Sequence, residues 1–244
     1  MKYSLYMTKQ KSFFIKERDD LSRANVLKGE ADLKSRIGAV AEAMSLYDEA
    51  ESLFKKVKDN LGRADVLRGK GDLNISADTP EKATALYDEA ETLYLDEKND
   101  LGHADILFSK GNLECLLCAE DTALNFYNEA EELFIKAKNN RGRANVLQCK
   151  GDLKQRQKMY EESLSLYQGA FDLFHSLGDM ADSALTQGKI CKIYTILGNK
   201  SAVEDAAAIA KSAFLHVPDN VRKSIEECIA EATRILEGNI IANI

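Results

Sequence analysis

The chain has 244 residues, of which 45% are hydrophobic and 30% charged, and its formal net charge is -7. This acidic balance argues against a nucleic-acid backbone as the main ligand, because phosphate binding needs a clustered basic face. No apolar run approaches the roughly 18 residues of a membrane span, the N-terminus is no secretory signal, and five cysteines without a framework suit a reducing compartment. We therefore expect a cytoplasmic protein that binds neither nucleic acid nor membrane.

A block of sequence recurs with a period of 40 residues: segment 61–73 (LGRADVLRGKGDL) has counterparts at 21–33, 101–113 and 141–153. A second phrase keeps the same period, since LYDEAE at 46–51 returns at 86–91 and, as FYNEAE, at 126–131. A fixed period without insertions indicates one supersecondary unit stacked on copies of itself. We therefore expect a single solenoid over 1–244.

The chain begins with what looks like half a unit, because Phe13 and Phe14 fall one period before Leu53 and Phe54. We expect a separate N-terminal capping helix there. Each full unit is expected to hold a helix A (about 21–36 in the first) and a helix B (about 39–57). The expected divisions are a capping helix at 1–18, repeats at 21–58, 61–98, 101–138 and 141–178, a degenerate fifth repeat at 181–216, and a C-terminal capping helix at 219–238.

Turn residues separate the helices. Gly38 marks the turn inside the first unit, and Thr79 with Pro80 provides a cap and a first helical position in the second. Between units, the stretches 59–62, 99–102 and 139–142 contain Asn and Gly, which we expect to supply the left-handed residue that ends a helix.

Small and aromatic residues recur at fixed offsets in every unit. Gly71 is followed by Ala83, Tyr87 and Ala90, and Tyr127 stands at the place of Tyr87 in the next unit, so both tyrosines are expected in the core. The matching sets are Gly111, Ala123, Tyr127 and Ala130; Ala31, Ala43, Tyr47 and Ala50; and Gly151, Ser163, Tyr167 and Ala170.

This spacing resembles the tetratricopeptide repeat (TPR). The usual TPR period is 34 residues, and the longer period is similar to that of the TPRs of kinesin light chains and of the LGN/Pins mitotic scaffolds. The resemblance implies an all-α, right-handed superhelix of antiparallel helix pairs, in which helix A lines the concave surface. HEAT and armadillo repeats have periods near 40, but the Gly/Ala–Ala–Tyr–Ala spacing disfavours them.

A position where TPRs usually carry Leu, just before the small residue, is filled by Glu30 in the first unit and by Lys70, Lys110 and Lys150 in the next three. We expect each lysine to bury its stem and to lead its ammonium group to water or to a carboxylate. The paired acids of helix B diverge at a spacing of two, so they are expected on a solvated outer face. These pairs are Glu49/Glu51, Glu89/Glu91 and Glu129/Glu131.

The motif Cys115-Leu116-Leu117-Cys118 invites a redox or zinc reading. Its register places it at the C-terminal end of a helix A, where the helix dipole does not favour a thiolate, and no second cysteine pair completes a zinc site. We expect reduced structural thiols, no metal and no cofactor. The sequence also lacks a phosphate loop, an HExxH motif and a nucleophile elbow, so we expect no enzyme activity.

If helix A lines a concave surface, as the resemblance implies, a polar stripe of this helix faces the groove and is suited to a peptide or protein partner. An alternative is that these side chains cap helix A and bridge neighbouring units. The positions are Asn25, Lys28, Asp32 and Arg36, then Asp65, Arg68 and Asp72, then Asp105, Phe108 and Asn112, then Asn145, Gln148, Asp152 and Arg156.

We expect a non-catalytic scaffold whose groove binds a partner protein or peptide. Five of eight Asp/Asn positions in the stripe are carboxylates, which favours a basic partner, with the strongest negative potential between Asp105 and Asp152. The TPR clamp that binds acidic chaperone tails does not match this sequence. Asp32 follows Lys28 where the clamp needs Asn, Gly69 replaces the next Asn, and Asp105 replaces a Lys. The alternative is a sensor module for a signalling peptide or small molecule, disfavoured because we find no segment for an output domain. The sequence leaves the oligomeric state open.

Overall fold

The computed structural model describes residues 2–76 and 79–212, together with positions 217, 219, 222, 223, 225–227, 229, 230, 233 and 234; the side chains of 2–18 and 76 are outside this description. Every regular element in these ranges is a helix. From α2 onward the helices start 20 residues apart, which confirms the 40-residue helix pair. The helices are α1 (Lys2–Arg36), α2 (Val40–Val57), α3 (Asn60–Ser76), α4 (Pro80–Asp96), α5 (Asp100–Leu116), α6 (Glu120–Lys136), α7 (Asn140–Arg156), α8 (Tyr160–Ser176), α9 (Met180–Ile196) and α10 (Lys200–Ser212).

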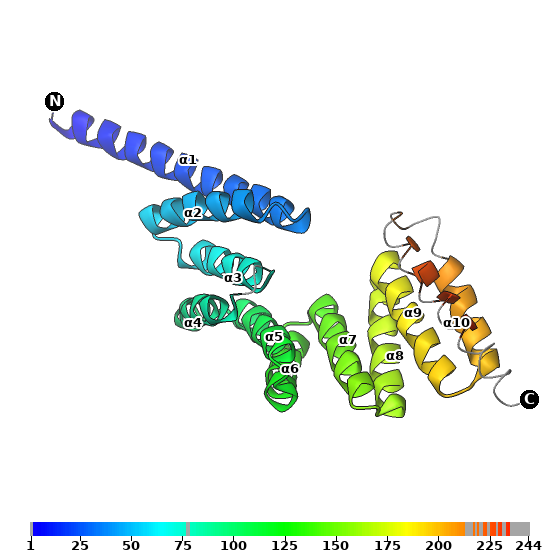
Figure 1. Cartoon of the computed structure of the whole chain (residues 1–244). Coiled ribbons are helices and arrows are strands. Elements are labelled where there is room, and N and C mark those ends of the chain that lie inside the picture. Colours follow the sequence, from blue (N-terminus) through cyan, green and yellow to red (C-terminus); the bar gives the residue numbers. More distant parts are fainter. Residues whose placement is uncertain are drawn as a thin grey trace, which may run out of the picture. The chain divides into compact units, whose positions relative to one another are not determined.

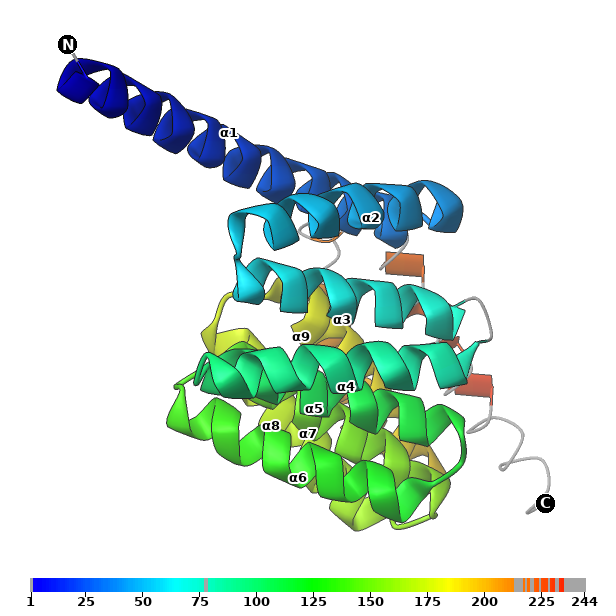
Figure 2. The same ribbon diagram turned by 90° about the vertical axis from the view of Figure 1, so that its left-hand side faces the viewer.

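The chain divides into two compact units, Met1–Leu117 with α1 to α5 and Cys118–Ile244 with α6 to α10. Within each unit, helices that follow one another in the sequence pack side by side as antiparallel neighbours (Figures 1 and 2). The result is a TPR-type, all-α solenoid architecture in each unit. A single solenoid over 1–244 stays a prediction. Within the described ranges, none of the helices combines the length and apolar character that a membrane span requires.

The core explains the fixed spacing of small and aromatic residues. Tyr87 and Tyr127 are 0% and 1% exposed, which confirms that both are core residues. A Cβ added to Gly71 would collide with the ring of Tyr87, and one added to Gly151 would come within 2.6 Å of the ring of Tyr167. Glycine therefore lets the backbone of helix A rest directly on an aromatic ring of helix B.

The turns depart from the sequence prediction. The left-handed residue that ends helix B is Lys58, Lys98 or Lys138, with φ between 53° and 60°, and not the Asn or Gly that follows. Asp59, Asn99 and Asn139 instead cap the next helix, each accepting a hydrogen bond from a glycine N–H three residues on. Gly38 does take the left-handed conformation.

The glycines that follow these turns are needed because they leave room for an aromatic ring, and not because they adopt a positive φ. Gly62, Gly102 and Gly142 are helical, and a Cβ on any of them would strike the aromatic ring at the end of the preceding helix B. Thr79 stands before α4 and Pro80 begins it, as predicted, but the Thr79 hydroxyl donates to the Asn74 carbonyl (3.0 Å) and does not cap the helix.

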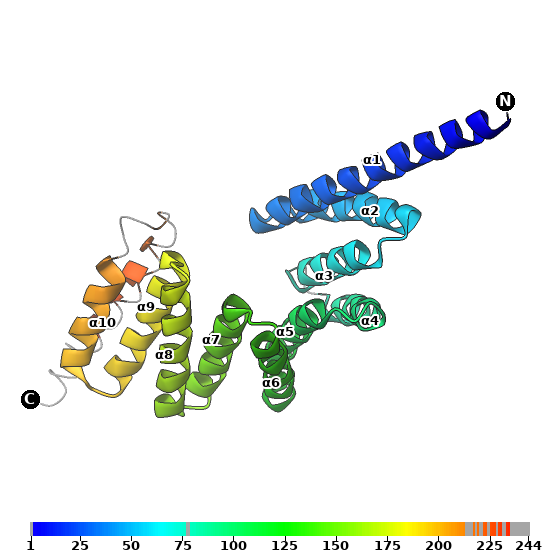
Figure 3. The same ribbon diagram turned by 180° about the vertical axis from the view of Figure 1, so that it is seen from behind.

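The predicted break between a capping helix at 1–18 and a helix A at 21–36 is wrong. α1 runs without interruption from Lys2 to Arg36 and extends past the end of α2 (Figure 3). The other B-to-A turns have glycine either at the left-handed position, as at Gly178, or at the ring-packing position, as at Gly62. Here the two positions are Arg18 and Ser22, so the turn lacks both glycines and the helix continues.

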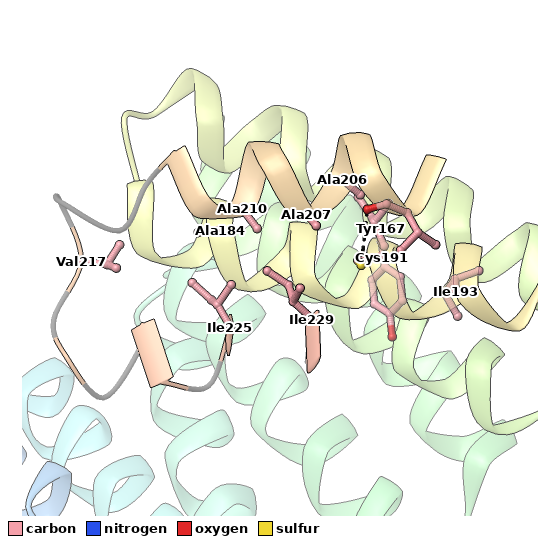
Figure 4. Packing of buried hydrophobic residues seen from close by; sticks show 12 residues of the cluster. Tyr167, Ala184, Cys191, Ile193, Ala206, Ala207, Ala210, Val217, Ile225 and Ile229 are labelled. Carbon is pink, nitrogen blue, oxygen red and sulfur yellow. Dashed lines mark hydrogen bonds between the residues drawn. The ribbon is translucent and has the colours of Figure 1, made fainter. Parts of the chain in front are cut away.

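In the second unit, α9 and α10 carry the last part of the described core. Figure 4 shows Val217, Ile225 and Ile229 beside Ala184 and Ala207, and all five are buried. Ten of the twenty positions of the C-terminal capping helix predicted at 219–238 are described, and all ten are helical. The other ten positions lie outside the described residues, as does the end of the degenerate repeat after Ser212.

Candidate partner-binding surface

In the first unit, predicted groove residues from three A-type helices meet in one polar cluster. The Lys28 ammonium on α1 donates to a carboxylate oxygen of Asp65 on α3 at 2.7 Å. Arg68 Nη1 lies 3.8 Å from Asp72, one turn further along α3. Burial opposes the charge of Arg68, but attraction to Asp72, Asp105 and Asp65 outweighs it and raises the pKa of the guanidinium. We call Lys28, Asp65, Arg68, Asp72 and Asp105 the inner cluster.

Buried tyrosines of α4 donate hydrogen bonds to two aspartates of the inner cluster. The Tyr87 hydroxyl donates to Asp72 at 2.6 Å and the Tyr94 hydroxyl donates to Asp65 at 2.5 Å. Because the rings are locked in the core, the carboxylates they bind are fixed in orientation. Sequence reasoning treated Tyr87 as a packing residue only and did not single out Tyr94. The available signal was a constant offset of 15 residues between Asp and Tyr, at 32/47, 72/87 and 152/167.

The inner cluster holds carboxylates that the fold itself disfavours. Burial raises the pKa of Asp72 and of Asp105, and repulsion from neighbouring carboxylates adds to both increases. The Nε of Arg68 is buried and has no hydrogen-bond partner among the described residues. The Arg68 donor is therefore a polar group that the described part of the protein leaves unsatisfied.

The other predicted residues of the first unit lie near the cluster's helices but outside it. Asn25 is exposed and donates to the Leu21 carbonyl of its own helix at 3.0 Å. Asp32 is exposed and accepts from the Tyr47 hydroxyl at 2.5 Å. Arg36 is exposed at the end of α1, and Phe108 and Asn112 are half-buried on α5.

In the second unit, several predicted residues bridge adjacent repeats. Asp152 on α7 accepts from the Tyr167 hydroxyl at 2.6 Å and from the Lys189 ammonium at 2.7 Å through both carboxylate oxygens. Gln148 donates to the Thr186 hydroxyl at 2.9 Å. The prediction of a strong negative potential at Asp152 is therefore wrong, because Lys189 on α9 neutralises it. Asn145 is half-buried, and Arg156 is exposed at 3.9 Å from Glu120.

These contacts give weight to the alternative reading, in which the stripe bridges neighbouring repeats. Lys28 with Asp65, and Asp152 with Lys189, join successive A-type helices. In the inner cluster, the Nε of Arg68 is the polar atom that lacks a hydrogen-bond partner among the described residues.

A second row of ion pairs follows the seam between helix B and the next helix A. Lys70 donates to Glu51 at 2.6 Å, and the same contact joins Lys110 to Glu91 and Lys150 to Glu131. The prediction that the lysines reach carboxylates is confirmed. The prediction that these acids lie on a solvated outer face is wrong for the second acid of each pair, since the seam partly encloses it and Glu51 is only 9% exposed. Burial alone would raise the pKa of Glu51, but hydrogen bonds from Lys55 and Lys70 hold this pKa at about 2.

The cysteines provide no metal site in the described part of the chain. Cys115 lies in the last turn of α5, at the C-terminal end as predicted, and Cys118 follows that helix with φ of 59°. No group of three or more His, Cys, Asp or Glu residues that could hold a metal ion occurs among the described residues. Cys228 lies outside them.

Comparison with known proteins identifies the fold. No protein-family model and no curated protein matches the chain. The solved structure of BtubC (BKLC) from P. vanneervenii is similar, with a TM-score of 0.65 and 18% identity over 84% of this chain and 92% of that one. The TPR-like repeats of a putative kinesin light chain from Podosopora anserina match with a TM-score of 0.59 and 10% identity over 79% of this chain and 95% of that one.

Two longer structures are also similar. Aspartyl phosphate phosphatase F from Bacillus subtilis matches with a TM-score of 0.73 and 14% identity over 97% of this chain. A Rap protein complexed with competence and sporulation factor matches with a TM-score of 0.73 and 13% identity over 88% of it. The chain spans 64% of the length of each of these two proteins. At these identities the likeness shows the TPR-type fold and confirms the resemblance seen in the repeats.

Proposed function

We propose that the protein is a non-catalytic interaction scaffold that binds a partner protein or peptide on the polar face formed by α1, α3 and α5, with the A-type helices α7 and α9 offering an equivalent face. The inner cluster is the observation that carries this proposal. It places a guanidinium among three carboxylates on the face that, in the TPR fold, is expected to line the groove.

The charge of the inner cluster favours a basic partner. Three carboxylates stand against two cations, and the pKa values of Asp72 and Asp105 are raised because their ionised forms are held at a cost. A Lys or Arg side chain from a partner relieves that cost and adds charge-assisted hydrogen bonds, each worth about 1.5–3 kcal/mol. Asn25, Asp32, Arg36, Phe108 and Asn112 supply the surrounding contacts in the same unit, and Asn145, Gln148, Asp152 and Arg156 supply those of the second.

The composition of the cluster also supports binding over catalysis. It contains no thiol or imidazole, and two of its carboxylates are engaged by tyrosine hydroxyls, with Lys28 also donating to Asp65. One structure with a similar fold is named as a phosphatase, but a likeness at 14% identity carries the fold and no activity. The proposal also assigns the protein to the cytoplasm, where its thiols stay reduced.

The test is selection of binding peptides from a random library displayed on phage, with the intact protein as bait. We expect enrichment of Lys- and Arg-containing peptides whose binding weakens as salt rises. The combined variant Asp72→Ala and Asp105→Ala, which leaves the Asp152–Lys189 pair intact, should lose this binding. The matched control, Glu89→Ala with Glu129→Ala on the outer face of helix B, should keep it. If the control loses binding and the Asp72/Asp105 variant keeps it, the partner uses the outer face and the proposal fails.

A second candidate is a sensor module for a signalling peptide. The similarity to a Rap protein that was crystallised with competence and sporulation factor favours it. The two candidates differ in the partner they need. Short selected peptides that bind with full affinity favour the sensor, whereas a need for an extended or folded partner favours the scaffold.

A further inference from the structure

α1 exposes two apolar side chains whose repeat equivalents are buried. Val26 and Leu33 are 61% and 59% exposed. Their equivalents in the next three repeats are no more than 3% exposed. Because the same residue types stand at the same repeat positions, the difference reflects a missing neighbour and not a change of face. The equivalents are Val66 and Leu73, Ile106 and Leu113, and Val146 and Leu153.

In the later repeats, the helix B that precedes each helix A covers this face. α2 packs against α3 in this way, with the rings of Phe54 and Tyr47 against Gly62 and Gly69. Among the described residues of its unit, α1 has no such neighbour, because the residues before its A-type half continue the same helix and run away from it (Figure 2). The face of Val26 and Leu33 is therefore an unfilled helix B site.

The sequence of residues 2–18 fits that site. Phe13 and Phe14 stand one period before Leu53 and Phe54 of α2. The charges of the seam ion pair are exchanged in the first repeat. Glu51 pairs with Lys70, and one period earlier the equivalent positions hold Lys11 and Glu30. Both charges are inverted together, so a helix of sequence 2–18 laid on α1 restores the seam.

The helix cannot fold back on itself to do this while it is continuous from Lys2 to Arg36. A tight turn there would need a left-handed Arg18 and would place the Cβ of Ser22 where the other turns admit an aromatic ring. We propose that a second copy of this chain fills the site, so that the α1 helices of two copies pack antiparallel and each covers Val26 and Leu33 of the other.

The register of this pairing is self-consistent. Residue 54 lies against 62, and 47 against 69, so one period earlier residue 14 faces 22 and residue 7 faces 29. Both pairs are centred on residue 18, and α1 itself, spanning 2–36, is centred on residue 19. Two antiparallel copies thus pair about a two-fold axis near residue 18, and the Lys11–Glu30 pair forms twice.

The first experiment identifies which chain supplies the covering helix. Unlabelled and ¹⁵N-labelled protein are mixed, allowed to exchange and treated with a carbodiimide, which joins lysine to a carboxylate in contact with it. Lys11–Glu30 cross-links should contain mixed-isotope pairs as often as same-isotope pairs. The Lys70–Glu51 pair within one chain is the internal control and should give only same-isotope pairs.

The second experiment tests the surface itself by sedimentation equilibrium. The protein should be a dimer, and Val26→Ser with Leu33→Ser should weaken dimerisation at least about tenfold, because the apolar contacts are lost. Ile135→Ser, at a residue of the second unit that is also about half exposed, should change nothing. Lys11→Glu should weaken the dimer, and adding Glu30→Lys should restore it.

Each other outcome overturns the proposal. Same-isotope Lys11–Glu30 cross-links in a monomer assign the site to the chain's own N-terminal segment. If the protein is a monomer and the Lys11–Glu30 cross-link does not form, the face of Val26 and Leu33 binds neither a second copy nor the chain's own N-terminal segment. A dimer that survives both the serine pair and the single charge reversal is held together elsewhere.

Discussion

At the scale of single residues, Asp105 is a charge that the fold holds at a cost. Its pKa is raised by burial and by Asp65 and Asp72, with Arg68 opposing. A raised carboxylate pKa means that the folded state takes up a proton more readily than the unfolded chain, so ionisation near neutral pH costs stability. Polar groups of this kind are characteristic of binding sites, where a partner completes what the free protein leaves incomplete.

We expect Asp105→Asn to stabilise the protein at pH 7, since it removes a disfavoured charge and keeps the shape. The gain should shrink as the pH falls through the raised pKa of Asp105 toward the ordinary Asp value near 4. Urea unfolding between pH 7 and pH 4 measures it, with Asp121→Asn at an exposed site on α6 as the control. A loss of stability at pH 7 would show that Asp105 supports the fold.

Glu51 is the opposite case, with a pKa held at about 2. Its contribution to stability is present above the unfolded value near 4.3 and is lost as the pH falls from there through 2. Glu51→Gln should cost up to about 3 kcal/mol at pH 7, and the deficit should narrow between pH 4.5 and pH 2. Chemical unfolding across this range tests it. The exposed neighbour Glu49→Gln should stay within about 0.5 kcal/mol at every pH.

At the scale of elements, the join between helix B and helix A depends on a ring lying on a bare backbone. Gly102→Ala would place its Cβ inside the ring of Tyr94, so we expect a loss of about 1–3 kcal/mol despite the better helix propensity of alanine. Gly169→Ala is the control, because its Cβ meets only the end of Leu147, at 3.3 Å. Thermal unfolding of both variants decides it; similar stabilities would contradict the ring contact.

The residues that end α2, α4 and α6 adopt a positive φ, which is unfavourable for lysine. Lys138 has φ of 55°, in the left-handed region that glycine adopts freely. Lys138→Gly should stabilise the protein by about 0.5–1 kcal/mol, as expected at a helix C′ position. Glu132→Gly inside α6 should instead lose about 1 kcal/mol, because glycine weakens a helix interior. If both variants lose stability equally in urea unfolding, the left-handed conformation at Lys138 does not occur in solution.

At the scale of the whole molecule, helices that are neighbours in sequence provide most of the packing within each unit. A solenoid of this kind distributes stability locally, so damage in one repeat should fade with distance along the chain. Tyr87→Ala should cost about 3–5 kcal/mol in its own repeat. Hydrogen exchange should show α3 and α4 losing protection while α7 and α8 keep theirs. Tyr167→Ala, in the repeat formed by α7 and α8, should give the reverse. Equal loss in all helices would indicate one fully cooperative body.

The sequence determined the period, the positions of the helices from α2 to α9 and the tyrosine core. Some features are local or strictly periodic and are therefore visible in a single sequence. They are the 40-residue repeat, the helical spacing of Ala83, Tyr87 and Ala90, and the glycines at a fixed offset from aromatic residues. The resemblance to the TPR followed from the same positions. The residues of the polar stripe all lie on the A-type helices, as their register indicated.

The tertiary structure alone decided which polar residues meet. Tyr87 with Asp72, Glu51 with Lys70, and Asp152 with Lys189 lie 15, 19 and 37 residues apart, and hydrophobic periodicity carries no information about such partners. Backbone conformation at the turns was also decided there, because packing of the flanking helices holds Lys138 left-handed where propensity favours Asn or Gly. The continuity of α1 has the same origin: a turn forms only where the residues on both sides allow two helices to touch.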